Sequence, residues 1–254
     1  MAIRLYGNWF SPFARKVALA LELKGLAYEP VDALRRDVHE ELKRLNPRAE
    51  VPVLKDGELL VVNSADIVQY LEWRYPEPPL YPAAIDDRVL VRTLERGSDA
   101  RVDPILVDCS YWRWAERDDQ PPAGLMEAGQ RDLDKFFTEL ERVLAPRPRP
   151  WPFGTPGLLE CALFPNLVAV RAVGLTIDEE RFAAVRDWLR SMRGHPVFAK
   201  DIKRTAGYMQ EFMSGGHERR KLFWRGDRIE WLLSHGYHGW FFQEIKAGRA
   251  VFPS

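Results

Sequence analysis

A serine hydroxyl stands directly in front of a long helical pattern near the start of the chain. Ser11 precedes Pro12, and proline is favoured at the first position of a helix because its missing N–H would have no partner there. Ser11 is therefore predicted at the N-cap, where its oxygen would accept a hydrogen bond from the first turn. The same hydroxyl can donate to an anion, since helix N-termini favour negative charge. Capping alone and anion binding both remain open at this point.

Residues 1–78 contain the elements that would position this serine. Apolar residues at helical spacing from Pro12 to Lys24 predict a helix that ends before Gly25. Two apolar runs joined by Lys55-Asp56-Gly57 predict a hairpin. A further helix is expected to begin with Ser64 as its capping residue. The predicted order of elements is β-α-β-α-β-β-α.

The remainder of the chain has a different pattern. A proline-rich stretch, PEPPLYP, favours a stiff connector, and longer helical patterns follow it. The predicted helices cover about residues 87–115, 125–144, 158–172 and 179–193. We therefore assign residues 1–78 to a first domain, 79–86 to a linker, 87–207 to an all-helical domain and 208–254 to a C-terminal extension rich in aromatic residues.

Several short motifs resemble the glutathione transferase family. In chain order they are Ser11-Pro12-Phe13, Asn46-Pro47 with Val51-Pro52-Val53-Leu54, Asn63-Ser64-Ala65-Asp66-Ile67 with Tyr70-Leu71, and GTPGLLECAL at residues 154–163. The first stretch looks most like serine-type enzymes of the plant tau class and their bacterial relatives. In the last motif Gly157 replaces a capping serine and Glu160 an aspartate, so the capping box is half kept. The resemblance covers about residues 3–205 and implies an α/β thioredoxin-like N-terminal domain, an all-α C-terminal domain and a homodimer.

The resemblance also implies glutathione as co-substrate and assigns residues to its site. Val51, before a cis Pro52, would pair its backbone with the tripeptide, and Ser64 would bind a carboxylate at a helix N-terminus. The implied glutathione-binding residues are Phe13, Glu50, Val51, Pro52, Asn63 and Ser64. The chain departs from the family at Glu50, where lysine is common, and at Asn63, where glutamate is. The residue that holds the glycine carboxylate is left open among Arg35, Arg36, His39, Lys43 and Arg48.

Ser11 is the predicted catalytic residue. A thiol with a pKa of about 8.5 needs roughly 2.7 kcal/mol of stabilisation of its anion to reach a pKa of about 6.5. A hydrogen bond to a charged acceptor supplies about 1.5–3 kcal/mol. A helix N-terminus adds about 0.3–1 kcal/mol. A hydroxyl at a helix start therefore has the required magnitude, without a base or a metal; Tyr6 is the alternative, because other transferase classes use a tyrosine late in the first strand.

An apolar pocket for the second substrate is expected beside Ser11. The candidates to line it are Trp9, Phe10 and Phe13 from the first domain, with Tyr111, Trp112 and Trp114 from the helical domain. Aromatic residues at helical spacing are as often ordinary core, and that alternative stays open.

The composition disfavours several other classes. Lysine plus arginine equals aspartate plus glutamate at 37 each, so no basic field draws the chain to nucleic acid or an acidic membrane. We expect a cytoplasmic protein, since we find neither a signal peptide nor an uncharged apolar run of about 18 residues. Cys109 and Cys161 are expected to be core residues without a disulfide. His235 and His238 have no third ligand nearby, so no metal is expected.

The extension, residues 208–254, lies beyond the resemblance. Its many aromatic residues are expected to pack against the helical domain or across a dimer interface, with a lid over the second-substrate pocket as the alternative. The expected function is transfer of an alkyl or aryl group from a hydrophobic electrophile to the glutathione thiolate, as in detoxification. The alternatives are ether cleavage, dehalogenation, isomerisation or peroxide reduction at the same site, and a binding or regulatory protein without catalysis.

Overall fold

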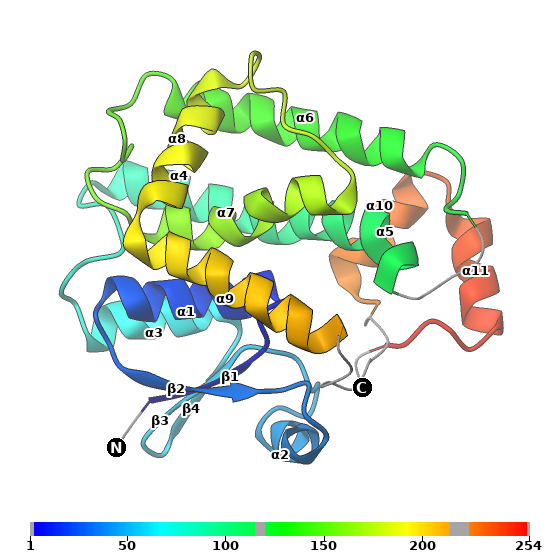
Figure 1. Ribbon diagram of the computed structural model, residues 1–254, viewed down its shortest axis with the longest axis horizontal. Coiled ribbons are helices and arrows are strands. Elements are labelled where there is room, and N and C mark those ends of the chain that lie inside the picture. Colours follow the sequence, from blue (N-terminus) through cyan, green and yellow to red (C-terminus); the bar gives the residue numbers. More distant parts are fainter. Residues whose placement is uncertain (1–2, 115–119, 214–223, 253–254) are drawn as a thin grey trace.

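A four-stranded mixed sheet forms the first layer of the molecule (Figure 1). The computed structural model describes residues 3–114, 120–213 and 224–252, without the side chains of Arg36, Arg113 and Trp114. The strands are β1 (Ile3–Gly7), β2 (Tyr28–Asp32), β3 (Val53–Asp56) and β4 (Leu59–Val62). Their spatial order is β2-β1-β3-β4, with β1 parallel to β2 and antiparallel to β3. The predicted hairpin at Asp56 and Gly57 is confirmed, because β3 and β4 pair antiparallel across it.

Helices cover both faces of this sheet. Side chains alternate between the two faces along a strand, so Leu5 packs with α1 (Pro12–Leu23) and α3 (Ser64–Arg74), while Tyr6 packs with α2 (Arg36–Leu45). The element order and this layering confirm the predicted α/β thioredoxin-like domain. Helix α1 lies between the sheet and the helical domain, which explains why its residues from Ala14 to Leu21 are all buried.

Buried ion pairs fix α1 against the helical domain. The Arg15 side chain is 5% exposed and its Nη2 lies 2.5 Å from Asp201 Oδ2, while Lys16 Nζ lies 3.1 Å from Glu95 Oε1. Removing one partner of such a pair leaves an uncompensated buried charge, which is strongly unfavourable. The position of Ser11 at the start of α1 is therefore set by contacts with both domains.

The helical domain surrounds a buried central helix. Its elements are α4 (Ile85–Gly97), a π-helical turn η1 (Ser98–Val102), α5 (Asp103–Trp114), α6 (Leu125–Leu144), α7 (Leu158–Ala169), a 3-10 turn η2 (Val170–Val173), α8 (Ala183–Gly194) and α9 (Pro196–Met213). Every residue of α7 from Leu158 to Leu167 is buried. The prediction of one uninterrupted helix over 87–115 is wrong, because η1 interrupts it. Such π turns occur frequently at functional sites.

Glycine is required at the start of α7 by a close approach of the backbone. A Cβ on Gly157 would lie 2.3 Å from the carbonyl oxygen of Leu80, which accepts the N–H of Leu158 at 2.8 Å. Glu160 supplies the half of the capping box that remains, since its Oε2 accepts the Gly157 N–H at 2.8 Å. The half-kept box is therefore a consequence of close contact with the connector.

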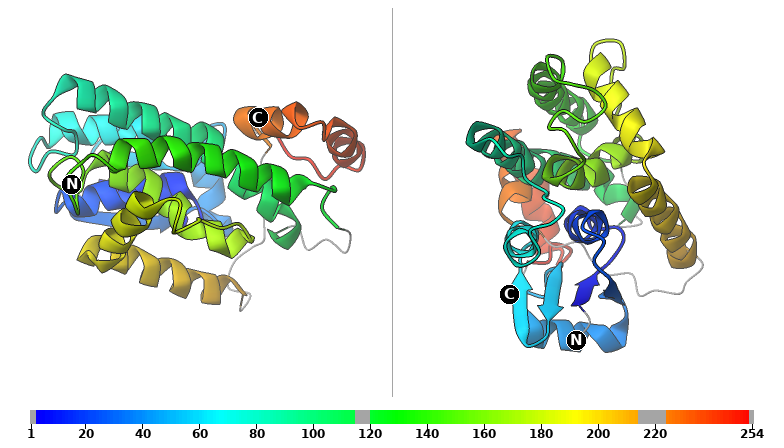
Figure 2. Two further views of the ribbon diagram at one scale, coloured as in Figure 1. Left: turned by 90° about the horizontal axis from the view of Figure 1, so that it is seen from above. Right: turned by 90° about the vertical axis from the view of Figure 1, so that its left-hand side faces the viewer.

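The expected boundary between residues 207 and 208 falls inside α9, which runs on to Met213. The described part of the extension beyond α9 forms two further helices, α10 (Gly226–Ser234) and α11 (His238–Lys246). They lie at the α5 end of the helical domain, coloured orange and red in Figure 1, and both views of Figure 2 place them beside that domain. Trp231, Leu232 and Phe241 are buried there, at 8%, 0% and 3% exposure. Among the described residues, no helix is both long enough and apolar enough to cross a membrane.

Candidate functional site

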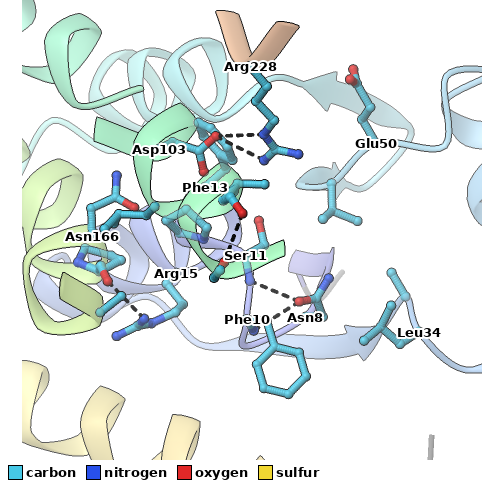
Figure 3. Close-up of a pocket in the computed structure, with 18 of the residues that line it drawn as sticks. Asn8, Phe10, Ser11, Phe13, Arg15, Leu34, Glu50, Asp103, Asn166 and Arg228 are labelled. Carbon is cyan, nitrogen blue, oxygen red and sulfur yellow. Dashed lines mark hydrogen bonds and ion pairs between the residues drawn. The ribbon is translucent and has the colours of Figure 1, made fainter. Parts of the chain in front are cut away.

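A cavity of about 350 Å³ lies where the sheet domain, the helical domain and the extension meet. Ser11 and Glu50 come from the first domain, Asp103 and Asn166 from the helical domain, and Arg228 from the extension (Figure 3). Most of the remaining wall is apolar. Its volume and its few polar groups on apolar walls are typical of a small-molecule site.

Ser11 is the N-cap of α1, as the sequence predicts. Its Oγ accepts the N–H of Ala14 at 3.3 Å, and accepting through the oxygen leaves the hydroxyl hydrogen to donate a second hydrogen bond. Asn8 fixes the approach to this serine, because its Oδ1 accepts the N–H groups of Phe10 and Ser11, each at 3.0 Å (Figure 3). The role of Asn8 was not predicted, although an asparagine that hydrogen-bonds its own backbone a few residues on is a known turn signal.

Tyr6, the alternative to Ser11, is placed differently. It is fully buried on the α2 side of the sheet, where its hydroxyl donates to Glu41 Oε1 at 2.6 Å and accepts from Arg4 at 2.7 Å. Burial and the hydrogen bond to Glu41 raise the pKa of Tyr6 to about 12. Tyr6 is not among the described residues that line the cavity, so the geometry favours Ser11.

The residues assigned to glutathione by resemblance fall into two groups. Phe13, Glu50 and Val51 line the cavity, and the peptide bond between Val51 and Pro52 is cis, as the resemblance implies. Asn63 and Ser64 lie at the start of α3, outside the described lining of this cavity.

Ser64 does not cap α3, contrary to the sequence prediction. Asn63 is the N-cap, with φ 68° and ψ 129°, and makes no side-chain cap hydrogen bond. A non-glycine residue in that region costs on the order of 1–3 kcal/mol, and such residues cluster at functional sites. The Asn63 amide instead donates to Asp66 Oδ2 at 3.2 Å, while Ser64, the first helical residue, is 6% exposed.

Glu50 is an ionised carboxylate held by two arginines. Its Oε2 lies 3.0 Å from Arg48 Nε, and its Oε1 lies 3.1 Å from Arg225 Nη1. Partial burial opposes ionisation, but the hydrogen bond from Arg48 and the charges of both arginines outweigh it and lower the pKa of Glu50. Of the basic candidates for the glycine carboxylate whose side chains are described, His39 alone lines the cavity.

Charged residues that the sequence analysis missed complete the wall. Arg228 Nε and Nη2 donate to Asp103 Oδ2 at 3.2 and 3.0 Å, and Asp103 directly follows the π turn η1 (Figure 3). Arg15 lines the cavity while it pairs with Asp201. No local pattern marks these residues, because each pair joins elements far apart in the sequence.

The aromatic residues expected around the second substrate separate into three places. Phe10 and Phe13 line the cavity. Tyr111 and Trp112 instead pack against Trp240 of the extension, with ring centroids 5.8 and 5.0 Å away, because the extension covers that face of α5.

Trp9 also lies outside this cavity. The Arg204 guanidinium covers its ring at 3.9 Å, and Trp9 lines a separate cavity beside β2 and α9. The side chain of Trp114 is outside the described residues.

The cysteines have no part in this site. Cys109 and Cys161 are both buried and unpaired with each other, and burial raises the pKa of Cys109 to about 12 and that of Cys161 well above its usual range. Reactive cysteines instead have lowered pKa values and partial exposure. Among the residues that the structure describes, no cluster of three or more His, Cys, Asp or Glu side chains could hold a metal ion.

Comparison with known proteins gives one family. The N-terminal domain of glutathione S-transferase matches residues 5–79, and its C-terminal domain matches residues 123–191. A probable maleylacetoacetate isomerase of Vibrio cholerae serotype O1 is 40% identical over 210 residues, which cover 79% of this chain and 95% of that protein. Glutathione S-transferase Z1 of Arabidopsis thaliana is 42% identical over 91 residues, and the match spans 41% of that relative and 35% of this chain.

Solved structures also match the glutathione S-transferase family. The maleylacetoacetate isomerase of Anaeromyxobacter dehalogenans 2CP-1, crystallised with GSH in its active site, superimposes with a TM-score of 0.63 at 28% identity. The superposition covers 79% of this chain and 94% of that one. These relatives give no support to the narrower resemblance to the tau class. The chain belongs to the glutathione S-transferase family.

Proposed function

We propose that this chain is a glutathione-dependent enzyme that isomerises an electron-poor cis double bond. The observation that carries the proposal is the hydroxyl of Ser11, which caps α1 at the wall of a cavity of about 350 Å³. Isomerisation is favoured over the expected alkyl or aryl transfer because two similar proteins are named maleylacetoacetate isomerase. A maleyl group contains a cis double bond between two carbonyl carbons, which makes that bond open to a nucleophile.

The residues present fit glutathione. A hydroxyl donor and a helix N-terminus at Ser11 suit a thiolate, and the backbone of Val51 beside the cis bond suits strand-like pairing with a tripeptide. Asn63 and Ser64 at the start of α3 suit the carboxylate of a γ-glutamyl group. Phe13 and Glu50 would flank the remainder of the peptide. Bound glutathione would supply a sulfur nucleophile that adds reversibly to the double bond.

The chain itself would supply orientation and an electrostatic bias. Ser11 would donate its hydroxyl hydrogen to the sulfur and so favour the ionised form, while Asn8 holds the loop that presents it. Apolar side chains such as Phe10 and Leu106 in the wall would hold the second substrate and exclude water. In this proposal residues 1–78 hold glutathione, while 87–207 and the extension 208–254 shape the second-substrate side across the linker 79–86.

Group transfer is the second candidate, favoured by the apolar wall that Phe10, Phe13 and Leu106 give to the cavity. Both reactions begin with the same nucleophile, so Ser11 would serve either. They differ in stoichiometry, because isomerisation regenerates glutathione and transfer consumes it.

That difference gives the test. The protein is incubated with cis-β-benzoylacrylate, an enone with a cis double bond, and a small amount of glutathione, and the products are followed by proton NMR. We expect the trans isomer to exceed the glutathione present while free thiol stays constant. Consumption of one thiol per product formed would favour transfer instead. Retention on immobilised glutathione without any turnover would favour a binding protein.

We also propose a homodimer. Exposed large apolar side chains include Leu59 and Leu60 of β4, Trp73 of α3, and Ile85 and Val89 of α4. These elements, cyan to teal, lie along one side of the molecule in the right-hand view of Figure 2. Burying these side chains against a second copy of the chain would remove their apolar area from water and favour association.

A further inference from the structure

An aromatic anchor just before α10 holds the described part of the extension on the helical domain. Trp224 is 1% exposed, and its ring lies edge-on to those of Tyr111 and Phe241, at centroid distances of 5.1 and 5.2 Å. Its backbone N–H donates to the carbonyl of Val251 at 2.7 Å, which closes the described extension on itself. Because Trp224 is held in place, the backbone position of the next residue, Arg225, is fixed as well.

Arg225 reaches from this anchor across to the first domain. Its Nη1 lies 3.1 Å from Glu50 Oε1, and its guanidinium carbon lies 5.0 Å from the centre of the Phe13 ring. Arg225 lines the same cavity as Ser11, and its side chain is 32% exposed. It lies beyond residues 123–191, where the family's C-terminal domain matches.

The Arg225 guanidinium has N–H donors left over for a ligand. A guanidinium has five N–H donors, and within the described part of the chain Arg225 donates one hydrogen bond, to Glu50. Glu50 keeps a second arginine, Arg48, at 3.0 Å, so its charge stays paired when Arg225 turns to a ligand. Arg15 and Arg228, by contrast, each hold an aspartate through two nitrogens.

The positive charge beside Glu50 favours an anion. Of the three arginines that line the cavity among the described residues, Arg15 is paired with Asp201 and Arg228 with Asp103. Glu50 is instead shared by two arginines, Arg48 and Arg225, so the charge that no carboxylate balances lies there. The aromatic face under the Arg225 guanidinium adds a surface on which its plane can rest while its fork points at a carboxylate.

We propose that Arg225 is the specificity-determining residue of this cavity and binds a carboxylate on the second substrate. The inference rests on the proposed function only in that the second substrate enters the cavity beside Ser11. The apolar wall holds the hydrocarbon part of the substrate, and the extension supplies the cation that recognises its charged end. A substrate that carries both features is a small apolar acid.

The test compares an acid with its neutral ester. β-Benzoylpropionate and its methyl ester have a saturated chain that a thiol cannot add to, so their binding to the full chain, measured by isothermal titration calorimetry, does not depend on catalysis. A hydrogen-bonded ion pair predicts that the acid binds about tenfold more tightly than the ester. Arg225→Gln should abolish that preference, and Arg225→Lys should keep part of it.

A matched variant controls for docking of the extension. Arg96 lies 3.6 Å from Asp227 in α10, is 70% exposed and does not line the cavity, so Arg96→Gln should keep the full preference. Near-ultraviolet circular dichroism of each variant reports whether the cluster around Trp224 stays packed. A preference that survives Arg225→Gln, or that is absent from the unaltered protein, overturns the inference.

The inference and the proposed function fail in different ways. If the acid is preferred through Arg225 but cis-β-benzoylacrylate is not isomerised with glutathione, the isomerase proposal is wrong and the carboxylate site stands. If benzoylacrylate and its ester are isomerised equally well and Arg225→Gln leaves both KM values unchanged, the isomerase proposal stands and the carboxylate site is wrong. If both hold, Arg225→Gln raises KM for the acid about tenfold and leaves KM for the ester unchanged.

Discussion

Replacing Ser11 with alanine removes two interactions. Loss of the first lowers the stability of the fold, and loss of the second changes the thiol pKa and the activity. The Oγ of Ser11 accepts the Ala14 N–H at 3.3 Å, and loss of such an N-cap costs about 1 kcal/mol. In a chain of this size that corresponds to a Tm lower by about 2–4 °C. The proposed hydrogen bond to a thiolate has a charged acceptor and contributes about 1.5–3 kcal/mol. Its loss should raise the pKa of the bound thiol by about 1–2 and lower kcat/KM at neutral pH by roughly 10- to 100-fold.

Ser11→Asp separates the two effects. Aspartate caps a helix as well as serine does, and its charge suits a helix N-terminus, so Tm should be retained. A carboxylate has no proton to donate and repels an anion, so activity at neutral pH should fall further than in Ser11→Ala. The assay follows thiolate absorbance of the glutathione complex during a pH titration, together with kcat/KM and Tm. An unchanged thiol pKa in both variants would refute the mechanism.

Three further predictions concern stability and assembly. Burial raises the pKa of Glu160 from 4.5 to about 7, so the folded chain binds this proton more tightly than the unfolded chain. The free energy of unfolding should therefore fall by about 3 kcal/mol as pH rises from 4.5 to 7. Urea unfolding at several pH values measures this fall, which should be much smaller in Glu160→Gln. Gly157→Ala, whose Cβ would meet the Leu80 carbonyl, should destabilise by about 1–3 kcal/mol, whereas Gly207→Ala, in open space on a helix, should stabilise by about 0.5–1 kcal/mol. Trp73→Glu should shift the mass measured by light scattering from dimer to monomer, and a native mass of one chain would contradict the dimer.

Local signals account for the parts of the site that could be predicted from sequence. Ser11-Pro12 is a helix start because a residue without an N–H loses nothing there, and Asp56-Gly57 turns the chain because glycine tolerates positive φ. The family resemblance supplied the cis bond before Pro52, since spacing alone favours trans. Each of these signals lies within a few residues of the feature that it predicts.

No local residue pattern marks the parts that were missed. Ser64 looks like a cap by type, yet the chain enters α3 through Asn63 at positive φ, which displaces the cap by one residue. The π turn at Ser98–Val102 has no composition of its own. Arg225 and Glu50 are separated by 175 positions, and no period or motif connects them.

Because the packing around Trp224 stabilises the fold, the role of the extension is better tested by a point substitution than by deletion. Deleting residues 215–254 would remove Trp224 and Trp240 from beside Tyr111 and leave that face of α5 in water. Removing one large buried aromatic side chain costs about 3–5 kcal/mol, and whole domains are stable by only about 5–15 kcal/mol. Aggregation after deletion would follow whether or not the extension contacts substrate. Arg225 is a third exposed and carries no part of that packing, so a point change there tests recognition while the anchor stays in place.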